Sequence, residues 1–87
     1  MARVYLQPQL RDLTMGAAEV EVGGTTLREV IAELDRAYPG LARRLVYGDG
    51  LSPGIAASID GTVTARGLLA AVAADSEIHF LPAIGGG

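Results

Sequence analysis

The chain of 87 residues contains no cysteine, no lysine and no tryptophan, and it has a single histidine. Without cysteine it can form no disulfide, no thiolate zinc site and no cysteine-bound iron–sulfur cluster, so we expect a fold that depends on packing alone. Without lysine it offers no side-chain amine for a Schiff base or an isopeptide bond. One histidine and no cluster of carboxylates predict that the chain has no metal ligands.

Long hydrophobic runs and an excess of positive charge are also missing. The longest apolar run, residues 68–74, is far shorter than the roughly 20 residues of a membrane-spanning helix. Ten acidic residues against seven arginines give a net charge of −3, which leaves no cationic surface for nucleic acid. We therefore expect a soluble, cytoplasmic protein that binds neither membranes nor nucleic acids. Its length predicts one small domain, and a hydrophobic content of 49% allows a modest core.

Alternating apolar and polar residues predict five strands. In the last of them Ile78 and Phe80 share one face, and His79 and Leu81 share the other. Asp60-Gly61 predicts a two-residue hairpin turn between the third and fourth strands. The expected strands cover residues 3–7, 18–22, 55–59, 62–64 and 77–81, with a hairpin connection through residues 8–17 joining the first two.

One main helix is predicted between Thr26 and Tyr38. Thr26 and Glu29 fit a capping box, in which the Thr26 hydroxyl accepts from the Glu29 amide and the Glu29 carboxylate accepts from the Thr26 amide. Pro39-Gly40 ends the helix, and residues 41–45 add a possible further turn. The apolar stripe expected to face the core consists of Leu27, Val30, Ile31, Leu34 and Tyr38.

The order strand, strand, helix, strand, strand, strand predicts an α+β fold, because a single helix can cover one face of one sheet. A first hairpin, a crossover helix and returning strands are the parts of a β-grasp, the ubiquitin-like roll. We therefore expect a mixed sheet of about five strands with one main helix. Residues 1–82 are predicted to form this domain, and residues 83–87 a flexible, glycine-rich C-terminal tail.

The chain ends Pro82-Ala83-Ile84-Gly85-Gly86-Gly87, directly after an apolar strand. Composition alone allows the reading of a flexible end, since termini collect glycine and disorder. The ending, however, resembles that of the ubiquitin-related sulfur carriers, the MoaD/ThiS family, with matches at Pro82, Ile84, Gly86 and Gly87. The helix 26–38, the turn 59–61 and the strand 78–81 fit the same family, so the resemblance covers almost the whole chain.

This resemblance implies a sulfur carrier rather than an enzyme. A ubiquitin-activating-enzyme-like adenylyltransferase would adenylate the Gly87 carboxylate, which is ionised at pH 7, and sulfur would then replace AMP to give a thiocarboxylate. The implied acceptors are a cysteine synthase-like enzyme, the molybdopterin synthase large subunit or another enzyme of sulfur metabolism. The chain itself would bind no cofactor, because ATP and Mg²⁺ belong to the activating partner. The alternative function is a ubiquitin-like protein modifier or a non-catalytic interaction module.

The resemblance also implies which residues meet the partners. Pro82, Ala83, Ile84, Gly85 and Gly86 would enter a partner's channel, where glycine lets the backbone pass without side-chain bulk. Residues 83–87 can extend by at most about 17 Å.

Leu81 matches a position where the resembled proteins present an apolar side chain to their partners, and Tyr5 and His79 are predicted beside it. Leu81 is equally compatible with the scattered apolar residues of any surface. His79 has no nucleophile to serve, so we interpret it as a surface or structural residue and not as a general base. Arg43-Arg44 fits either an acidic partner or two solvated arginines.

Overall fold

The computed structural model describes residues 1–83, which form a five-stranded sheet, a two-stranded sheet and two α-helices. Neither helix in this range is long and apolar enough to cross a membrane. In chain order the elements are β1 (Ala2–Tyr5), the 3₁₀ turn η1 (Pro8–Leu10), β2 (Glu19–Val22), α1 (Leu27–Ala37), α2 (Leu41–Leu45), β3 (Val46–Tyr47), β4 (Gly50–Leu51), β5 (Ile55–Ile59), β6 (Thr62–Val63), the 3₁₀ turn η2 (Gly67–Leu69) and β7 (Glu77–Pro82).

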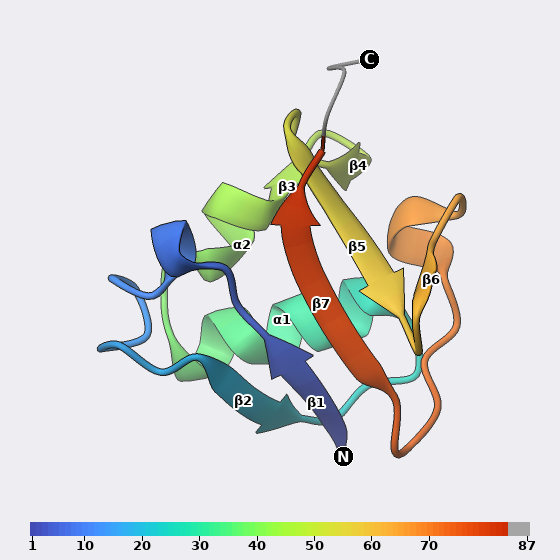
Figure 1. Cartoon of the computed structure of the whole chain (residues 1–87), viewed down its shortest axis with the longest axis horizontal. Coiled ribbons are helices and arrows are strands. Elements are labelled where there is room, and N and C mark those ends of the chain that lie inside the picture. Colours follow the sequence, from blue (N-terminus) through green and yellow to red (C-terminus); the bar gives the residue numbers. More distant parts are fainter. Residues whose placement is uncertain (84–87) are drawn as a thin grey trace.

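The main sheet has the strand order β2-β1-β7-β5-β6. The first and last strands, β1 and β7, lie side by side and are parallel, whereas the other neighbouring pairs are antiparallel. Both helices cover one face of this sheet (Figure 1). The predicted fold is thereby confirmed: a mixed five-stranded sheet with one main helix, arranged as a β-grasp.

The start of α1 is capped by two successive threonines. Glu29 donates its backbone N–H to the Thr26 hydroxyl at 3.2 Å, as predicted. The second predicted bond of the capping box, from the Thr26 N–H to the Glu29 carboxylate, is wrong. The Glu29 carboxylate accepts instead from the backbone N–H and the hydroxyl of Thr25, at 2.8 and 2.9 Å. The Thr25 backbone N–H and hydroxyl together hold the pKa of Glu29 below its usual value.

The end of α1 is fixed by Asp35 and Gly40. Gly40 has φ +106°, a backbone conformation that glycine adopts at little cost, and it turns the chain from α1 into α2. One carboxylate oxygen of Asp35 accepts from the backbone N–H groups of Gly40 and Ala42, at 3.0 and 3.1 Å. The predicted stop at Pro39-Gly40 and the predicted extra turn at residues 41–45 are both present.

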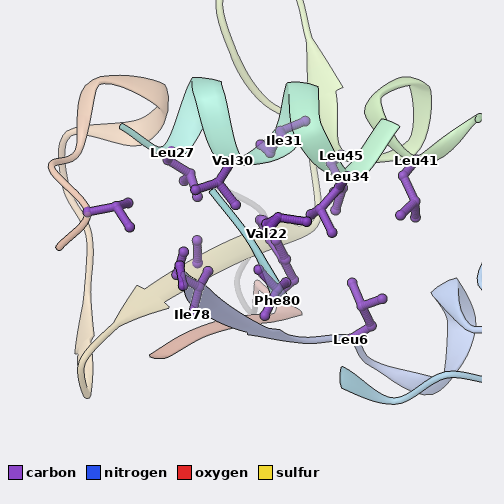
Figure 2. Packing of buried hydrophobic residues seen from close by; sticks show 14 of the residues in the cluster. Leu6, Val22, Leu27, Val30, Ile31, Leu34, Leu41, Leu45, Ile78 and Phe80 are labelled. Carbon is purple, nitrogen blue, oxygen red and sulfur yellow. The ribbon is translucent and has the colours of Figure 1, made fainter. Parts of the chain in front are cut away.

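The core lies between the helices and the sheet. Leu27, Val30, Ile31 and Leu34 of α1 are buried, and Tyr38 at the end of the predicted stripe is half-buried. Figure 2 shows the α1 side chains above the strand residues they cover. The strands contribute alternate residues to this layer, which include Val4, Leu6, Val22, Ala57, Ile78 and Phe80.

The predicted hairpin connection is confirmed, because residues 8–17 join the antiparallel strands β1 and β2. Within this connection η1 and a series of turns were not predicted, and they bury Leu10 and Thr14 against the domain. The strands β3 and β4 and the turn η2 were not predicted, because elements of two or three residues carry no measurable periodicity. The first strand, predicted at residues 3–7, covers Ala2–Tyr5 in the structure. Leu6, just beyond its end, is still buried in the core, and its backbone N–H donates to the Ala18 carbonyl at 2.8 Å.

Candidate functional site

The sheet face that points away from the helices carries Tyr5, His79 and Leu81. Tyr5 and His79 oppose each other in the parallel register of β1 and β7. Their rings stack with centroids 4.4 Å apart and planes 9° from parallel. Leu81 lies two residues beyond His79 on the same face of β7 and is half-buried. The structure therefore brings together the three residues for which we predicted a docking role.

Charge is distributed unevenly over this outer face. On the β2 side, Arg3 lies 3.5 Å from Glu19 and 3.8 Å from Glu21. On the β5 side, the residues opposite His79 and Leu81 are Ser58 and Ala56, which are uncharged. The charged side chains of the outer face thus lie on β2, on β1 at Arg3 and at the start of β7 at Glu77. The surroundings of Leu81, at the other end of β7, are uncharged.

A hollow of about 310 Å³ opens at the end of β1, between this strand and β7. The side-chain oxygen of Gln7 is buried there without a hydrogen-bond partner in residues 1–83. Arg11 donates from Nε to the Leu6 carbonyl at 3.0 Å and fixes the wall that η1 forms. The hollow is lined by Tyr5, Leu6, Gln7, Arg11, Ala18, His79, Phe80 and Leu81.

Sequence analysis missed Gln7, Arg11 and Ala18 as members of this hollow. They lie in or beside the connection 8–17, which has no periodic pattern from which an orientation could be read. The only signal in the sequence was the position of Gln7, two residues after Tyr5 and therefore on the same side of an extended chain. The fold of η1, which the sequence did not predict, places Arg11 there.

The base of the C-terminal segment is hydrogen-bonded to the sheet. β7 continues through Pro82, which opposes Ile55, and the Ala83 N–H donates to the Gly54 carbonyl at 2.9 Å. In an antiparallel ladder hydrogen-bonded and non-hydrogen-bonded pairs alternate, so the pair formed by Pro82 and Ile55 needs no N–H from Pro82. Proline therefore extends the strand by one residue beyond the predicted end at Leu81.

Pro82 and Ala83, the first two predicted tail residues, are exposed next to the start of β5. This places the end of the described chain at the same end of β7 as Leu81 (Figure 1). The remaining predicted tail residues, Ile84, Gly85, Gly86 and Gly87, lie outside the described residues.

His79 has one charged neighbour on its own strand. Its Nε2 lies 3.7 Å from a carboxylate oxygen of Glu77, and both side chains are about half exposed, at 45% and 57%. An exposed pair of this kind contributes little to stability. The ring of His79 is thus held mainly by its stacking on Tyr5, which agrees with a role as contact surface.

Comparison with known proteins shows the family of this chain. The fold is a ubiquitin-like β-grasp, and the model of the ThiS family matches residues 4–87. The chain belongs to the ThiS family, as the predicted resemblance to MoaD/ThiS proteins indicated.

The proteins similar to this chain include CysO sulfur carriers and a small archaeal modifier protein. The sulfur carrier protein CysO of Mycobacterium tuberculosis is 34% identical over 85 residues, which cover 90% of this chain and 89% of the relative. A chain in the crystal structure of the Amycolatopsis orientalis BexX/CysO complex is 29% identical, with a TM-score of 0.91 and full coverage of both chains. The small archaeal modifier protein 1 of Methanosarcina acetivorans is 27% identical, with a TM-score of 0.77 and coverage of 99% of this chain and 95% of that one.

Proposed function

We propose that the chain is a sulfur carrier whose reactive group is the C-terminal carboxylate of Gly87. The observation that carries this proposal is the combination of a family match that extends through residue 87 with a last strand that leads directly into Gly85-Gly86-Gly87. The similarity to the CysO sulfur carrier supports it. The proposal requires Gly87 to be the C-terminal residue of the functional protein.

The proposed chemistry has two steps, both on a partner enzyme. A carboxylate oxygen of Gly87 attacks the α-phosphorus of ATP, pyrophosphate leaves, and an acyl adenylate forms. A sulfur nucleophile at the oxidation level of sulfide then attacks the acyl carbon, and AMP leaves with the electrons of the broken C–O bond. The product is a thiocarboxylate. ATP and Mg²⁺ are bound by the adenylyltransferase, so the chain acts as a co-substrate and not as the catalyst.

The described residues support this role by separating docking from chemistry. The part of the outer face that carries Tyr5, His79 and Leu81 provides a contact surface for the adenylyltransferase. The bond between Ala83 and Gly54 holds the last described residue at the start of β5. A partner that binds the outer face can therefore receive the tail from a defined position.

Adenylation can be tested by the exchange of labelled pyrophosphate into ATP with the cognate adenylyltransferase. We expect Leu81→Glu to raise the KM for the carrier by about tenfold or more, because a charge replaces an apolar contact at the centre of the interface. Met15→Glu is the matched control, since it adds the same charge at a methionine that is 91% exposed and away from this face. An unchanged KM for Leu81→Glu would contradict the docking role.

The enzyme that accepts the sulfur is proposed from the resemblance alone. A cysteine synthase-like enzyme, the large subunit of molybdopterin synthase and another enzyme of sulfur metabolism are the candidates, and each would bind the outer face and take up the tail. Mixing the thiocarboxylate form with each enzyme and its sulfur-accepting substrate distinguishes them. The true acceptor consumes the thiocarboxylate as its sulfur bonds to the substrate, and the carboxylate returns when water cleaves the bond between the acyl carbon and that sulfur.

A second candidate function is protein modification, which the similarity to a small archaeal modifier protein favours. The activated Gly87 would then form an amide with an amine of another protein. Because this chain has no lysine, it cannot form chains with itself through isopeptide bonds to side chains. Adducts that survive denaturing electrophoresis and thiol treatment would support modification, and their absence with a sulfur-loaded carrier would favour sulfur transfer.

A further inference from the structure

A second hollow, of about 440 Å³, lies on the helix side of the molecule. Its volume is within the range of sites that bind small ligands or anchoring side chains. It is lined by Arg28, Ile31, Ala32, Ala42, Arg43, Val46, Gly48 and Leu68, which come from α1, α2, the β3 hairpin and η2. We call it the helix groove. None of its residues belongs to the outer face of the sheet, which lies on the other side of the main sheet (Figure 1).

The walls of the helix groove are apolar. Ile31, Ala42, Val46 and Leu68 are all buried or half-buried, so the groove continues the surface of the core outward. An apolar hollow at the surface, rimmed by charged side chains, is characteristic of a protein interaction site.

The helix groove is lined by two charged side chains, Arg28 and Arg43, and both are positive. Neither Arg28 nor Arg43 forms an ion pair or a side-chain hydrogen bond within residues 1–83. The acids of α1 do not neutralise them, because Glu29, Glu33 and Asp35 are each engaged by other groups.

The structure also separates the two arginines of the Arg43-Arg44 pair. Arg44 donates to the Gln9 carbonyl at 3.0 Å and lies 3.9 Å from an Asp12 carboxylate oxygen, so it ties α2 to the connection 8–17. Arg43 has no such partner and lines the groove instead. The helix groove therefore brings two guanidinium groups without ion pairs in residues 1–83 to the edge of one apolar hollow.

We propose that the helix groove is a second interaction site, which binds an acidic amphipathic segment of a partner protein. Apolar side chains of that segment occupy the hollow, and its carboxylates bind Arg28 and Arg43, whose planar guanidinium groups can each hold a carboxylate through two hydrogen bonds. Such a segment binds as an amphipathic helix in a groove. A partner in the helix groove leaves the outer face of the sheet free, so one protein can hold the chain while another binds that face. The site does not depend on the proposed sulfur chemistry.

The test uses a defined peptide and the ¹⁵N-labelled full chain. The probe is a 12-residue, N-acetylated and C-amidated peptide with leucines on one helical face and glutamates beside them. We expect the backbone signals of Ile31, Ala32 and Ala42 to shift on titration, and those of His79 and Leu81 to stay. Shifts centred on the outer face, or no shifts up to about 1 mM peptide, would overturn the proposal.

Charge reversal provides the matched control. Arg28→Glu with Arg43→Glu should weaken binding of the acidic peptide by about tenfold, because attraction is replaced by repulsion at two positions. The same variant should instead bind a peptide with lysine in place of each glutamate. Arg36→Glu with Arg66→Glu changes the net charge equally outside the groove and should leave binding within about twofold of the original. Equal losses of peptide affinity in the two double variants would show that binding depends only on net charge and would overturn the proposal.

Discussion

Asp60 joins the turn after β5 to the start of β7 through its own atoms. Its carboxylate accepts from the Glu77 backbone N–H and from the Ser76 hydroxyl, both at 2.8 Å, and its N–H donates to the Glu77 carbonyl at 2.8 Å. Its φ of +52° lies in the left-handed region, as the predicted Asp60-Gly61 turn requires. The Glu77 N–H and the Ser76 hydroxyl hold the pKa of Asp60 below its ordinary value of 3.8.

This pKa shift predicts how acid destabilises the protein. Because the folded pKa of Asp60 is below its unfolded value, its stabilising contribution is full above about pH 4 and is lost as the pH falls through the folded pKa. Asp60→Asn tolerates the left-handed backbone but cannot ionise. The melting temperature of this variant should therefore lie below that of the original chain at pH 7, and the difference should shrink toward pH 2.

Asp75→Asn is the control for that experiment. Asp75 is exposed and makes no side-chain hydrogen bond or ion pair in the described part of the chain. Its replacement should leave the acid dependence of the melting temperature unchanged. A difference between Asp60→Asn and the original chain that stays constant from pH 7 to pH 2 would contradict the account of Asp60.

At the scale of elements, Gly24 controls how closely β2 approaches α1. Its φ is +132°, and a Cβ atom there would lie 2.9 Å from the Val30 backbone nitrogen and 3.0 Å from the Val30 Cγ2. The first of these contacts is with helix backbone, which cannot rotate away as a side chain can. The neighbouring Gly23 has no atom within 4 Å of the corresponding position. Two adjacent glycines thus differ in what the fold requires of them.

Alanine should be far more destabilising at Gly24 than at Gly23. We expect Gly24→Ala to lower the free energy of unfolding by about 2 kcal/mol or more, because it adds both backbone strain and a clash. Gly23→Ala should change it by less than about 1 kcal/mol. Urea unfolding at pH 7 measures both. Similar midpoints for the two variants would show that the approach of β2 to α1 is not constrained as described.

The long elements were predictable because local signals and packing agree. The stripe on α1, the threonine cap, the Pro39-Gly40 stop and the two-residue turn at Asp60-Gly61 are all visible in the sequence, and each is found in the structure. The β3 hairpin, η1 and η2 were not predictable, since each is too short for a periodic pattern and is held by contacts with distant residues. The order of the strands likewise depends on tertiary packing.

The candidate site was predictable to a similar extent. Alternation along β7 placed His79 and Leu81 together, and their proximity to Tyr5 followed from the family resemblance. The stacking of Tyr5 on His79 depends on the parallel register of β1 and β7, which no local pattern encodes. The helix groove was also beyond prediction, because it combines residues from four elements that are brought together only by the fold.

At the scale of the whole molecule, the two faces of the main sheet differ. The helices cover one face (Figure 1), and Tyr5, His79 and Leu81 lie on the other. The strand that leads to the C-terminus lies in the middle of the sheet, between β1 and β5, and is therefore held on both sides. A last strand held in this way is what the proposed carrier needs if its tail must enter a partner at a fixed position.

The most direct test is the mass of the C-terminal peptide after incubation with the cognate adenylyltransferase, ATP and a sulfur donor. The account predicts a gain of about 16 Da, the difference between sulfur and oxygen, located at Gly87 by fragmentation. A variant without Gly87 should show no gain while it melts at nearly the same temperature, because the tail adds little to the core. An unmodified Gly87, or sulfur found at any other residue, would contradict the central claim.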